Sequence, residues 1–212
     1  MSKKNLAIIV IVLVLVMDQI LKVWIKTHFY LGDEVRVVGN WFLLHFIENK
    51  GMAFGFEFAG KFGKVLLTLF RVIAATAIFW YLLKLIKKGI PNGLVISMAM
   101  IIAGAFGNVI DSAFYGLIFS DSFGRIAQIF PTGGGYAPFL HGSVVDMLFF
   151  PIIKGTWPAW SPINAGQQFL FFSPVFNIAD SAISVGICMI LIFYRKYFAE
   201  EDKKKEKEIV EY

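Results

Sequence analysis

Carboxylate and amide side chains lie inside hydrophobic segments of this chain, where they are costly. Asn108 and Asp111 fall within one apolar stretch, and Asn177 and Asp180 repeat the same Asn-x-x-Asp spacing within another. Asp146 follows two valines and precedes a further apolar run. An ionised carboxylate at the centre of a bilayer costs about 2.5 to 3.5 kcal/mol on insertion scales, so such residues usually line polar, functional interiors. The sequence therefore predicts a polar site with three aspartates at the membrane.

A pair of neighbouring carboxylates suits the hydrolysis of a peptide bond. We expect Asp146 to lie in a segment that dips into the outer membrane boundary near the start of the last helix, and so to approach Asp180. Two carboxylates in a low-dielectric site cannot both ionise easily, so they share one proton. The ionised member can take a proton from water, while the neutral member polarises a carbonyl and later protonates the leaving amine. This is aspartyl-protease chemistry without a covalent intermediate.

Other catalytic arrangements have weaker support. The sequence contains no His-Glu-x-x-His, and its three histidines, at positions 28, 45 and 141, are far apart, so we expect no catalytic metal. No serine lies in a Gly-x-Ser-x-Gly pattern. A Ser-Lys pair would require Lys22 to reach across from the first helix, so a serine nucleophile stays a minor alternative.

The elements that carry these residues are hydrophobic. Hydrophobic residues make up 58% of the 212-residue chain and charged residues only 17%, a balance that is foreign to soluble domains. Apolar stretches of about 20 residues, long enough to cross the hydrocarbon core, occur at residues 5–25, 64–83, 93–115 and 174–194. The sequence predicts an all-α membrane protein with four transmembrane helices, folded as a single domain over residues 1–212.

The charges and loops complete this prediction. Basic clusters flank the predicted spans and account for the net charge of +5, so they argue for a membrane and against a nucleic-acid partner. Their positions place both termini, including a tail at 195–212, in the cytoplasm. Residues 30–58 alternate apolar and polar side chains around a Gly39-Asn40 turn, which predicts an outer β-rich platform. Residues 116–173 form a longer outer insert.

Helical spacing predicts which side chains share a face. Asn108 and Asp111 project together from the third span, because residues three apart lie on one side of a helix. A polar stripe in the fourth span consists of Asn177, Asp180, Ser181 and Ser184. Small residues in the third span allow another helix to approach closely; they are Ala103, Gly104 and Gly107. We therefore expect the two Asn-x-x-Asp helices to face each other.

Five blocks of sequence together carry a family resemblance. In chain order they are Asp18-x-x-x-Lys22, Glu48-Asn49-Lys50-Gly51-Met52-Ala53-Phe54, Gly107-Asn108-Val109-Ile110-Asp111, Val144-Val145-Asp146 and Phe176-Asn177-Ile178-Ala179-Asp180-Ser181-Ala182-Ile183. The set resembles bacterial lipoprotein signal peptidase, also called signal peptidase II. The resemblance extends from the first helix to residue 194.

This resemblance implies an activity. Such an enzyme removes signal peptides from prolipoproteins that carry a diacylglyceryl group, cutting just before the lipidated cysteine. It implies Asp146 and Asp180 as the catalytic pair. It also implies residues that position substrate or support the site, namely Asn49, Asn108, Asp111, Asn177, Asp18 and Lys22. It further implies no metal or organic cofactor, contact with membrane lipid, inhibition by globomycin-type cyclic peptides, and a site on the extracytoplasmic side of the bacterial inner membrane.

The chain departs from the family pattern in two places. The family usually has an arginine after the Gly-Asn-x-x-Asp aspartate, whereas this chain has Ser112, and the candidates to pair with Asp111 in its place are Arg71 and Arg125. The connection at 116–143 is longer than usual. We expect it to reshape the lid over the site or the substrate preference.

Two other classes of protein remain open from the sequence. Intramembrane carboxylates also serve as proton relays, which would suit a proton-coupled small transporter or channel. That reading requires a polar path to both membrane faces, but the last helix becomes wholly apolar from Val185 to Phe193. A non-catalytic membrane scaffold is the third class, in which the aspartates would be replaceable by asparagine.

Overall fold

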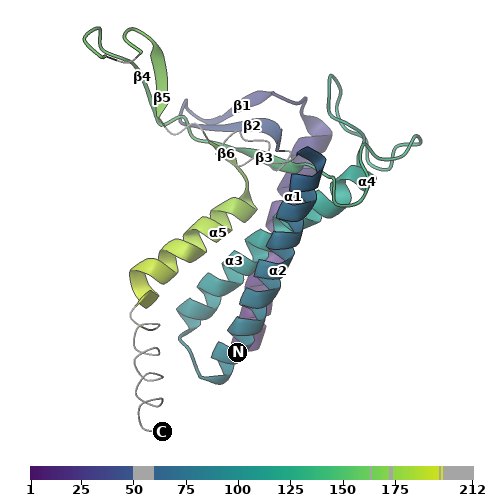
Figure 1. The fold of residues 1–212 in the computed structure, drawn as a ribbon, viewed down its shortest axis with the longest axis vertical. Coiled ribbons are helices and arrows are strands. Elements are labelled where there is room, and N and C mark those ends of the chain that lie inside the picture. Colours follow the sequence, from purple (N-terminus) through teal and green to yellow (C-terminus); the bar gives the residue numbers. More distant parts are fainter. Residues whose placement is uncertain (50–59, 163, 172–173, 196, 198–212) are drawn as a thin grey trace. The chain divides into compact units, whose positions relative to one another are not determined.

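The computed structural model describes residues 1–49, 60–162, 164–171, 174–195 and 197 (Figure 1). The chain divides into two compact units. One, here called the helical unit, comprises Met1–Met17, Leu69–Val109 and Ala179–Tyr212. The other, here called the sheet unit, comprises Asp18–Thr68 and Ile110–Ile178. Each unit is coherent in itself and is described in turn.

The helices match the predicted spans with shifted ends. They are α1 (Lys3–His28), α2 (Gly60–Lys87), α3 (Asn92–Ile110), the short α4 (Gly116–Ile118) and α5 (Ile178–Met189). A π-helical segment, η1 (Asp111–Tyr115), joins α3 to α4, and another, η2 (Ile190–Tyr194), extends α5. Within the part of the chain that the structure describes, three helical stretches are long and apolar enough to cross a membrane, namely 3–28, 63–87 and 92–118, while Ile178–Tyr194 is shorter.

The predicted start of the last helix at residue 174 is wrong. Val175–Phe176 forms the strand β6, and the helix begins only at Ile178. Val175 and Phe176 pair with Phe149 and Leu148 of another strand. Hydropathy alone assigns Val175 and Phe176 to a helix, but pairing with another strand makes them a β-strand instead.

The core of the helical unit lies between the first half of α1, the second half of α2 and α3. Ala7 packs with Leu82 and Leu85 of α2 and with Leu94 and Ile102 of α3, all of them buried. Other faces of α1 expose large apolar side chains, among them Ile8, Val12, Leu13, Val16 and Ile20. Exposed apolar surface along a long helix is the surface that a bilayer covers.

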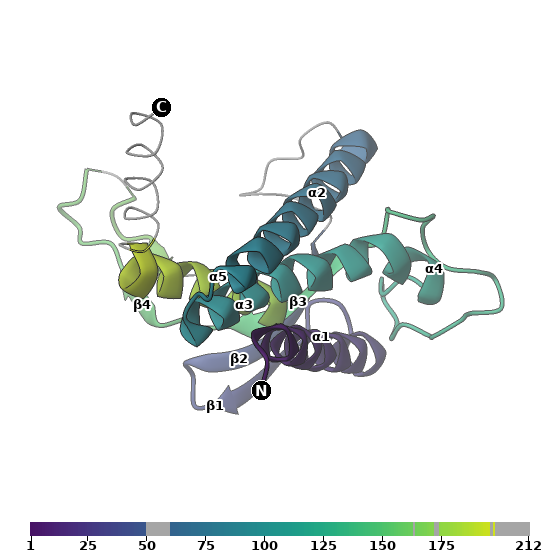
Figure 2. The same cartoon turned by 90° about the horizontal axis from the view of Figure 1, so that it is seen from below.

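Helix α5 lies against α3, as the small residues predict (Figure 2). A Cβ atom added to Gly104 would lie 2.2 Å from the carbonyl oxygen of Ala179, and one added to Gly186 would lie 2.6 Å from that of Ser97. Only a residue without a side chain permits backbones to come this close. The prediction that the two Asn-x-x-Asp helices face each other is confirmed.

The sheet unit is built on a four-stranded antiparallel sheet. It contains β1 (Glu34–Val38), β2 (Phe42–Asn49), β3 (Val144–Phe149) and β6 (Val175–Phe176), in the order β1-β2-β3-β6. The strands β4 (Ile153–Thr156) and β5 (Gln168–Phe171) form a separate two-stranded sheet. Gly39, with φ of 52°, turns the chain between β1 and β2. The predicted platform is thus present over 34–49, and its part at 50–58 lies outside the described residues.

One face of this sheet covers the second half of α1 and the η1–α4 segment. Phe46 of β2 and Val145 and Met147 of β3 pack with Ile25 of α1 and Tyr115 of η1 in a buried cluster. The tail at 198–212 lies outside the described residues.

Candidate active site

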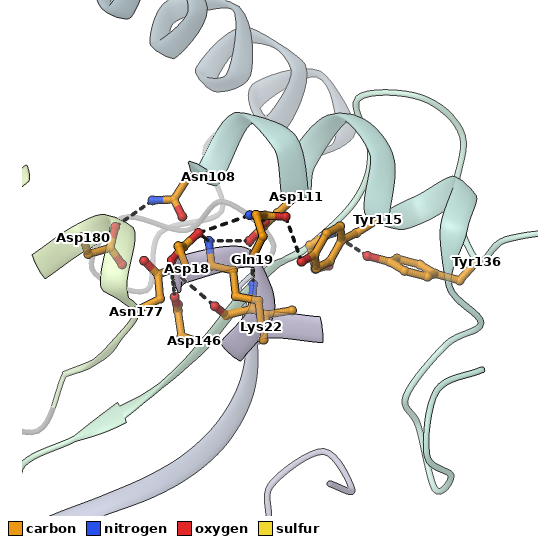
Figure 3. A network of polar contacts seen from close by, with 12 residues as sticks. Asp18, Gln19, Lys22, Asn108, Asp111, Tyr115, Tyr136, Asp146, Asn177 and Asp180 are labelled. Atoms are coloured by element: carbon orange, nitrogen blue, oxygen red, sulfur yellow. Dashed lines mark hydrogen bonds and ion pairs between the residues drawn. The ribbon is translucent and has the colours of Figure 1, made fainter. Parts of the chain in front are cut away.

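Asp180 of the helical unit is held by an amide from the facing helix. The side-chain Nδ2 of Asn108, on α3, donates to Oδ1 of Asp180 over 2.7 Å (Figure 3). Asp180 lies in the first turn of α5, where the helix dipole favours a negative charge. Asn108 is almost fully buried, so the pair is shielded from water on the side of α3. The close α3–α5 approach at Gly104 brings these two side chains within reach.

Asp146 of the sheet unit has a matching amide partner. Nδ2 of Asn177 donates to Oδ1 of Asp146 over 2.7 Å and also lies 3.3 Å from the carbonyl oxygen of Val145 (Figure 3). Both side chains are buried, with 2% and 0% of their surface exposed. Each proposed catalytic carboxylate therefore receives a hydrogen bond from an asparagine amide.

The structure defines the local setting of both residues. The segment that carries Asp146 is strand β3, where Asp146 lies opposite Ile47 of β2; its predicted place at the membrane boundary stays a prediction. Asn177 precedes α5 and is not part of its polar stripe, because the helix begins one residue later. In the second Asn-x-x-Asp motif, therefore, only Asp180 lies in a helix, and Asn177 lies just before it.

Asp18, Lys22 and Asp111 form a buried ionic network in the sheet unit. The Nζ of Lys22 lies 2.8 Å from Oδ2 of Asp18 and 2.8 Å from Oδ2 of Asp111. All three side chains are at most 1% exposed. Asp18 and Lys22 are one turn apart on α1, the spacing at which opposite charges on a helix meet. Gln19 contributes a further bond of 2.9 Å from Nε2 to Oδ1 of Asp111 (Figure 3).

Lys22 therefore supplies a positive charge to Asp111. The prediction of Arg125 in that role is wrong, because Arg125 pairs with Asp121 on the surface of the insert; that bond is also the main reason for the lowered pKa of Asp121. Arg71, the other candidate, belongs to the helical unit, whereas Asp111 belongs to the sheet unit; its pairing with Asp111 stays a prediction. Asp111 also accepts a bond of 3.3 Å from the backbone N–H of Val145. Through this bond the network holds strand β3 at the residue before Asp146.

Asn49 ends strand β2 and pairs with Val144 of β3. Because paired residues share a face and faces alternate along a strand, Ile47, Asn49 and Asp146 belong to one face of the sheet. Glu48 and Val145 belong to the opposite face, the one that covers the buried cluster. The predicted site residues of the sheet unit therefore fall into two sets. One is Asp18, Lys22 and Asp111, and the other is Asn49 at the end of β2, Asp146 within β3 and Asn177 after β6.

Several polar residues of this region received no role from the sequence. They are Gln19, Lys26, Glu48, Ser122 and Tyr136. Lys26 lies just beyond the predicted first span at 5–25, but in the structure it belongs to the last turns of α1 and is fully buried. Asp18, Lys22 and Lys26 follow one another at intervals of four residues, so a polar stripe on α1 was the available signal. The contacts of Ser122 and Tyr136 had no such signal, since they depend on how the insert folds back.

Buried carboxylates held by amides and by a lysine, on apolar helices with a small antiparallel sheet, agree with a membrane enzyme of the aspartyl type. The family model of signal peptidase (SPase) II matches residues 10–196. The chain belongs to the signal peptidase II family and is an aspartic endopeptidase of that family.

The relatives and solved structures agree with this assignment. A lipoprotein signal peptidase of Porphyromonas gingivalis is 50% identical over 185 residues, covering 87% of this chain and 80% of the relative. One from Amoebophilus asiaticus is 36% identical, with 92% and 79% covered. A bacterial membrane enzyme solved by the in meso method at 1.9 Å has a TM-score of 0.57 at 25% identity, with 90% and 92% covered.

Proposed function

We propose that this protein cleaves the signal peptide from diacylglyceryl-modified prolipoproteins, just before the lipidated cysteine, with Asp146 and Asp180 as the catalytic pair. The observation that carries the proposal is that each of the two carboxylates accepts a hydrogen bond from an asparagine side chain. Asn177 donates to one and Asn108 to the other, each over 2.7 Å. The family membership and the names of the relatives, lipoprotein signal peptidases, support the substrate class.

The proposed mechanism uses water as the nucleophile. The ionised aspartate takes a proton from water, and the water oxygen attacks the scissile carbonyl carbon. The neutral aspartate gives its proton to the carbonyl oxygen, so a neutral tetrahedral intermediate forms. The C–N bond then breaks as the nitrogen receives the proton that the first aspartate took from water, and a hydroxyl of the intermediate returns its proton to the second aspartate. The products are the carboxylic acid end of the signal peptide and the free amine of the lipidated cysteine, and both aspartates regain their starting states. No metal or organic cofactor takes part in this scheme.

The asparagines have a defined task in this scheme. An amide N–H that donates to one oxygen of a carboxylate fixes the plane of the carboxylate and favours its charged form. Asn108 and Asn177 would therefore hold the two aspartates in the orientation that water activation needs. Asn49 would bind substrate, and Asp18, Lys22 and Asp111 would support the strand that carries Asp146.

We infer four membrane spans, with α5 and η2 as the last. Ile178–Tyr194 rises about 25 Å at 1.5 Å per residue, close to the hydrocarbon thickness. It also exposes large apolar side chains for lipid, namely Val185, Ile187, Leu191, Ile192 and Phe193. Both termini would be cytoplasmic, as the basic clusters indicate. The site would then face the extracytoplasmic side, where globomycin-type cyclic peptides would compete with the substrate.

The decisive experiment is cleavage of a diacylglyceryl-modified prolipoprotein by purified protein in detergent. Wild type is compared with Asp146→Asn and Asp180→Asn, each with its thermal unfolding midpoint measured. We expect wild type to cleave and both folded variants to lose activity by at least about a thousandfold, as removal of a catalytic group does. Cleavage that survives in either variant would refute the pair. A wild type without cleavage would favour a transporter or a scaffold.

A further inference from the structure

The insert at 116–143 contributes to a buried polar cluster behind the platform strands. Lys26 of α1 forms an ion pair with Glu48 of β2. Nζ of Lys26 also donates to Oγ of Ser122 in the insert over 2.9 Å, and Oγ of Ser122 donates to Oε1 of Glu48 over 2.6 Å. Lys26 is 0%, Ser122 2% and Glu48 12% exposed. Three separate parts of the sheet unit thus meet in one closed triangle.

The insert is folded so that it covers this cluster. The backbone N–H of Tyr136 donates to the carbonyl oxygen of Phe119, and that of Ala137 to the carbonyl oxygen of Gly116. A Cβ at Gly135 would lie 2.0 Å from the oxygen of Gly116, so the returning chain needs glycine there. The rings of Tyr136 and Phe119 then lie 5.0 and 5.5 Å from Nζ of Lys26, within cation–π range.

Lys26 and Ser122 are not arranged as a nucleophile and its base. The lysine donates to the serine oxygen, and the serine proton goes to Glu48. The same carboxylate oxygen accepts from both groups. The cluster is therefore structural: its hydrogen bonds hold three segments together and do not activate a nucleophile.

The position of Glu48 gives this support a function. Glu48 is the neighbour of Asn49 and pairs with Val145, the neighbour of Asp146. Its side chain belongs to the face opposite Asn49 and Asp146, so the cluster fixes the end of β2 from behind. The ion pair is largely shielded from solvent, and the loss of Glu48 would leave the buried charge of Lys26 without this carboxylate.

We propose that Ser122 is a positioning residue, through which the insert holds the Lys26–Glu48 pair and with it the substrate-binding end of β2 at Asn49. This inference rests on the proposed function, since it takes Asn49 as a substrate contact. On this proposal the insert influences the affinity of the enzyme for the prolipoprotein. It does so through β2, the strand that pairs with β3 and its Asp146.

The test is steady-state cleavage of the modified prolipoprotein by full-length variants in detergent. We expect Ser122→Ala to raise KM about tenfold, the effect of losing one hydrogen bond to a charged group, with less than a twofold change in kcat. Ser122→Thr, which keeps the hydroxyl, restores KM. Glu48→Gln raises KM like Ser122→Ala and provides a second variant if the alanine protein does not fold. Arg125→Gln, on the exposed surface of the same insert, is the matched control and leaves KM unchanged.

A double-mutant cycle separates positioning from a general loss of fold. The KM of Asn49→Ala/Ser122→Ala should equal that of Asn49→Ala, because Ser122 acts through Asn49. Any of three results would overturn the inference. The effects of the two substitutions could add up, KM could equal that of wild type in both Ser122→Ala and Glu48→Gln, or the loss could be confined to kcat and the unfolding midpoint. Asp146→Asn is assayed alongside. Its activity would refute the proposed function, whereas an inactive Asp146→Asn with an unchanged Ser122→Ala would refute only the role of the insert.

Discussion

Nδ2 of Asn177 lies 2.7 Å from Oδ1 of Asp146, and both side chains are buried. Asn177 follows strand β6 directly and stands three residues before Asp180 in the sequence. One short segment therefore carries both an amide that binds the first proposed catalytic carboxylate and the second carboxylate itself. The β6–β3 pairing fixes the residues just before this segment.

This relationship predicts the effect of removing the amide. Asn177→Ala deletes the donor to a buried carboxylate, a hydrogen bond to a charged group that is worth about 1.5 to 3 kcal/mol. We expect kcat for prolipoprotein cleavage to fall about 10- to 150-fold. Gln128→Ala, at an exposed amide of the insert, serves as the control with unchanged kcat. An Asn177→Ala enzyme with wild-type kcat would show that the amide does not orient Asp146.

The close α3–α5 contact predicts a steric sensitivity. In Gly104→Ala, the new Cβ would lie 2.2 Å from the carbonyl oxygen of Ala179, so the helices must separate. We expect a loss of about 1 to 3 kcal/mol of stability and reduced cleavage, because the Asn108–Asp180 bond lies one turn away. The measurement is the thermal unfolding midpoint together with kcat. Gly133→Ala, with nothing within 4 Å of its Cβ, should match wild type; equal midpoints for all three proteins would contradict the packing argument.

Removal of the buried lysine should unfold or strongly weaken the protein. Lys22→Met leaves Asp18 and Asp111 buried without their shared cation, and breaking a buried ion pair on one side costs about 3 to 5 kcal/mol. We expect a much lower unfolding midpoint in detergent. Lys87→Met, at an exposed position in the last turn of α2, provides the control. A Lys22→Met midpoint equal to that of the control would mean that the network adds no stability.

Tyr136 predicts a pH dependence at the alkaline end. Burial raises the pKa of this phenol from 10.0 to about 12. As the pH rises above 10, the unfolded chain releases the proton while the folded protein keeps it until about pH 12, so the folded state loses stability by up to about 1.4 kcal/mol per pH unit. Below pH 10 this contribution is fully present.

Tyr136→Phe removes this titration. Unfolding midpoints of wild type and variant are compared from pH 7 to pH 11, so that effects of other groups cancel. We expect the variant to be less stable at pH 7, because the N–H of Ser143 loses its 2.6 Å acceptor, and the difference to shrink above pH 10. A difference that is constant with pH would contradict the shifted titration.

Local sequence predicts part of the site and misses the rest for physical reasons. The Asp18–Lys22 pair follows from helical spacing alone, and the small residues of α3 indicate the contact with α5. The partner of Asp111 was not predictable in this way, because Lys22 is 89 positions away and reaches it only through the packing of α1 against η1. The start of α5 was misplaced because β6 exists only by pairing with β3.

The sequence by itself determined the membrane setting, the family and the identity of the paired asparagines and aspartates, because hydropathy, composition and motif spacing are properties of neighbouring residues. Only the tertiary structure decided which amide holds which carboxylate, that Asp146 lies in a strand, and that the insert meets Lys26 and Glu48. Each of these depends on contacts between segments that are distant in the sequence. A lysine such as Lys26 can be exposed in a loop or buried in a core, and only the packing of the folded chain decides between the two.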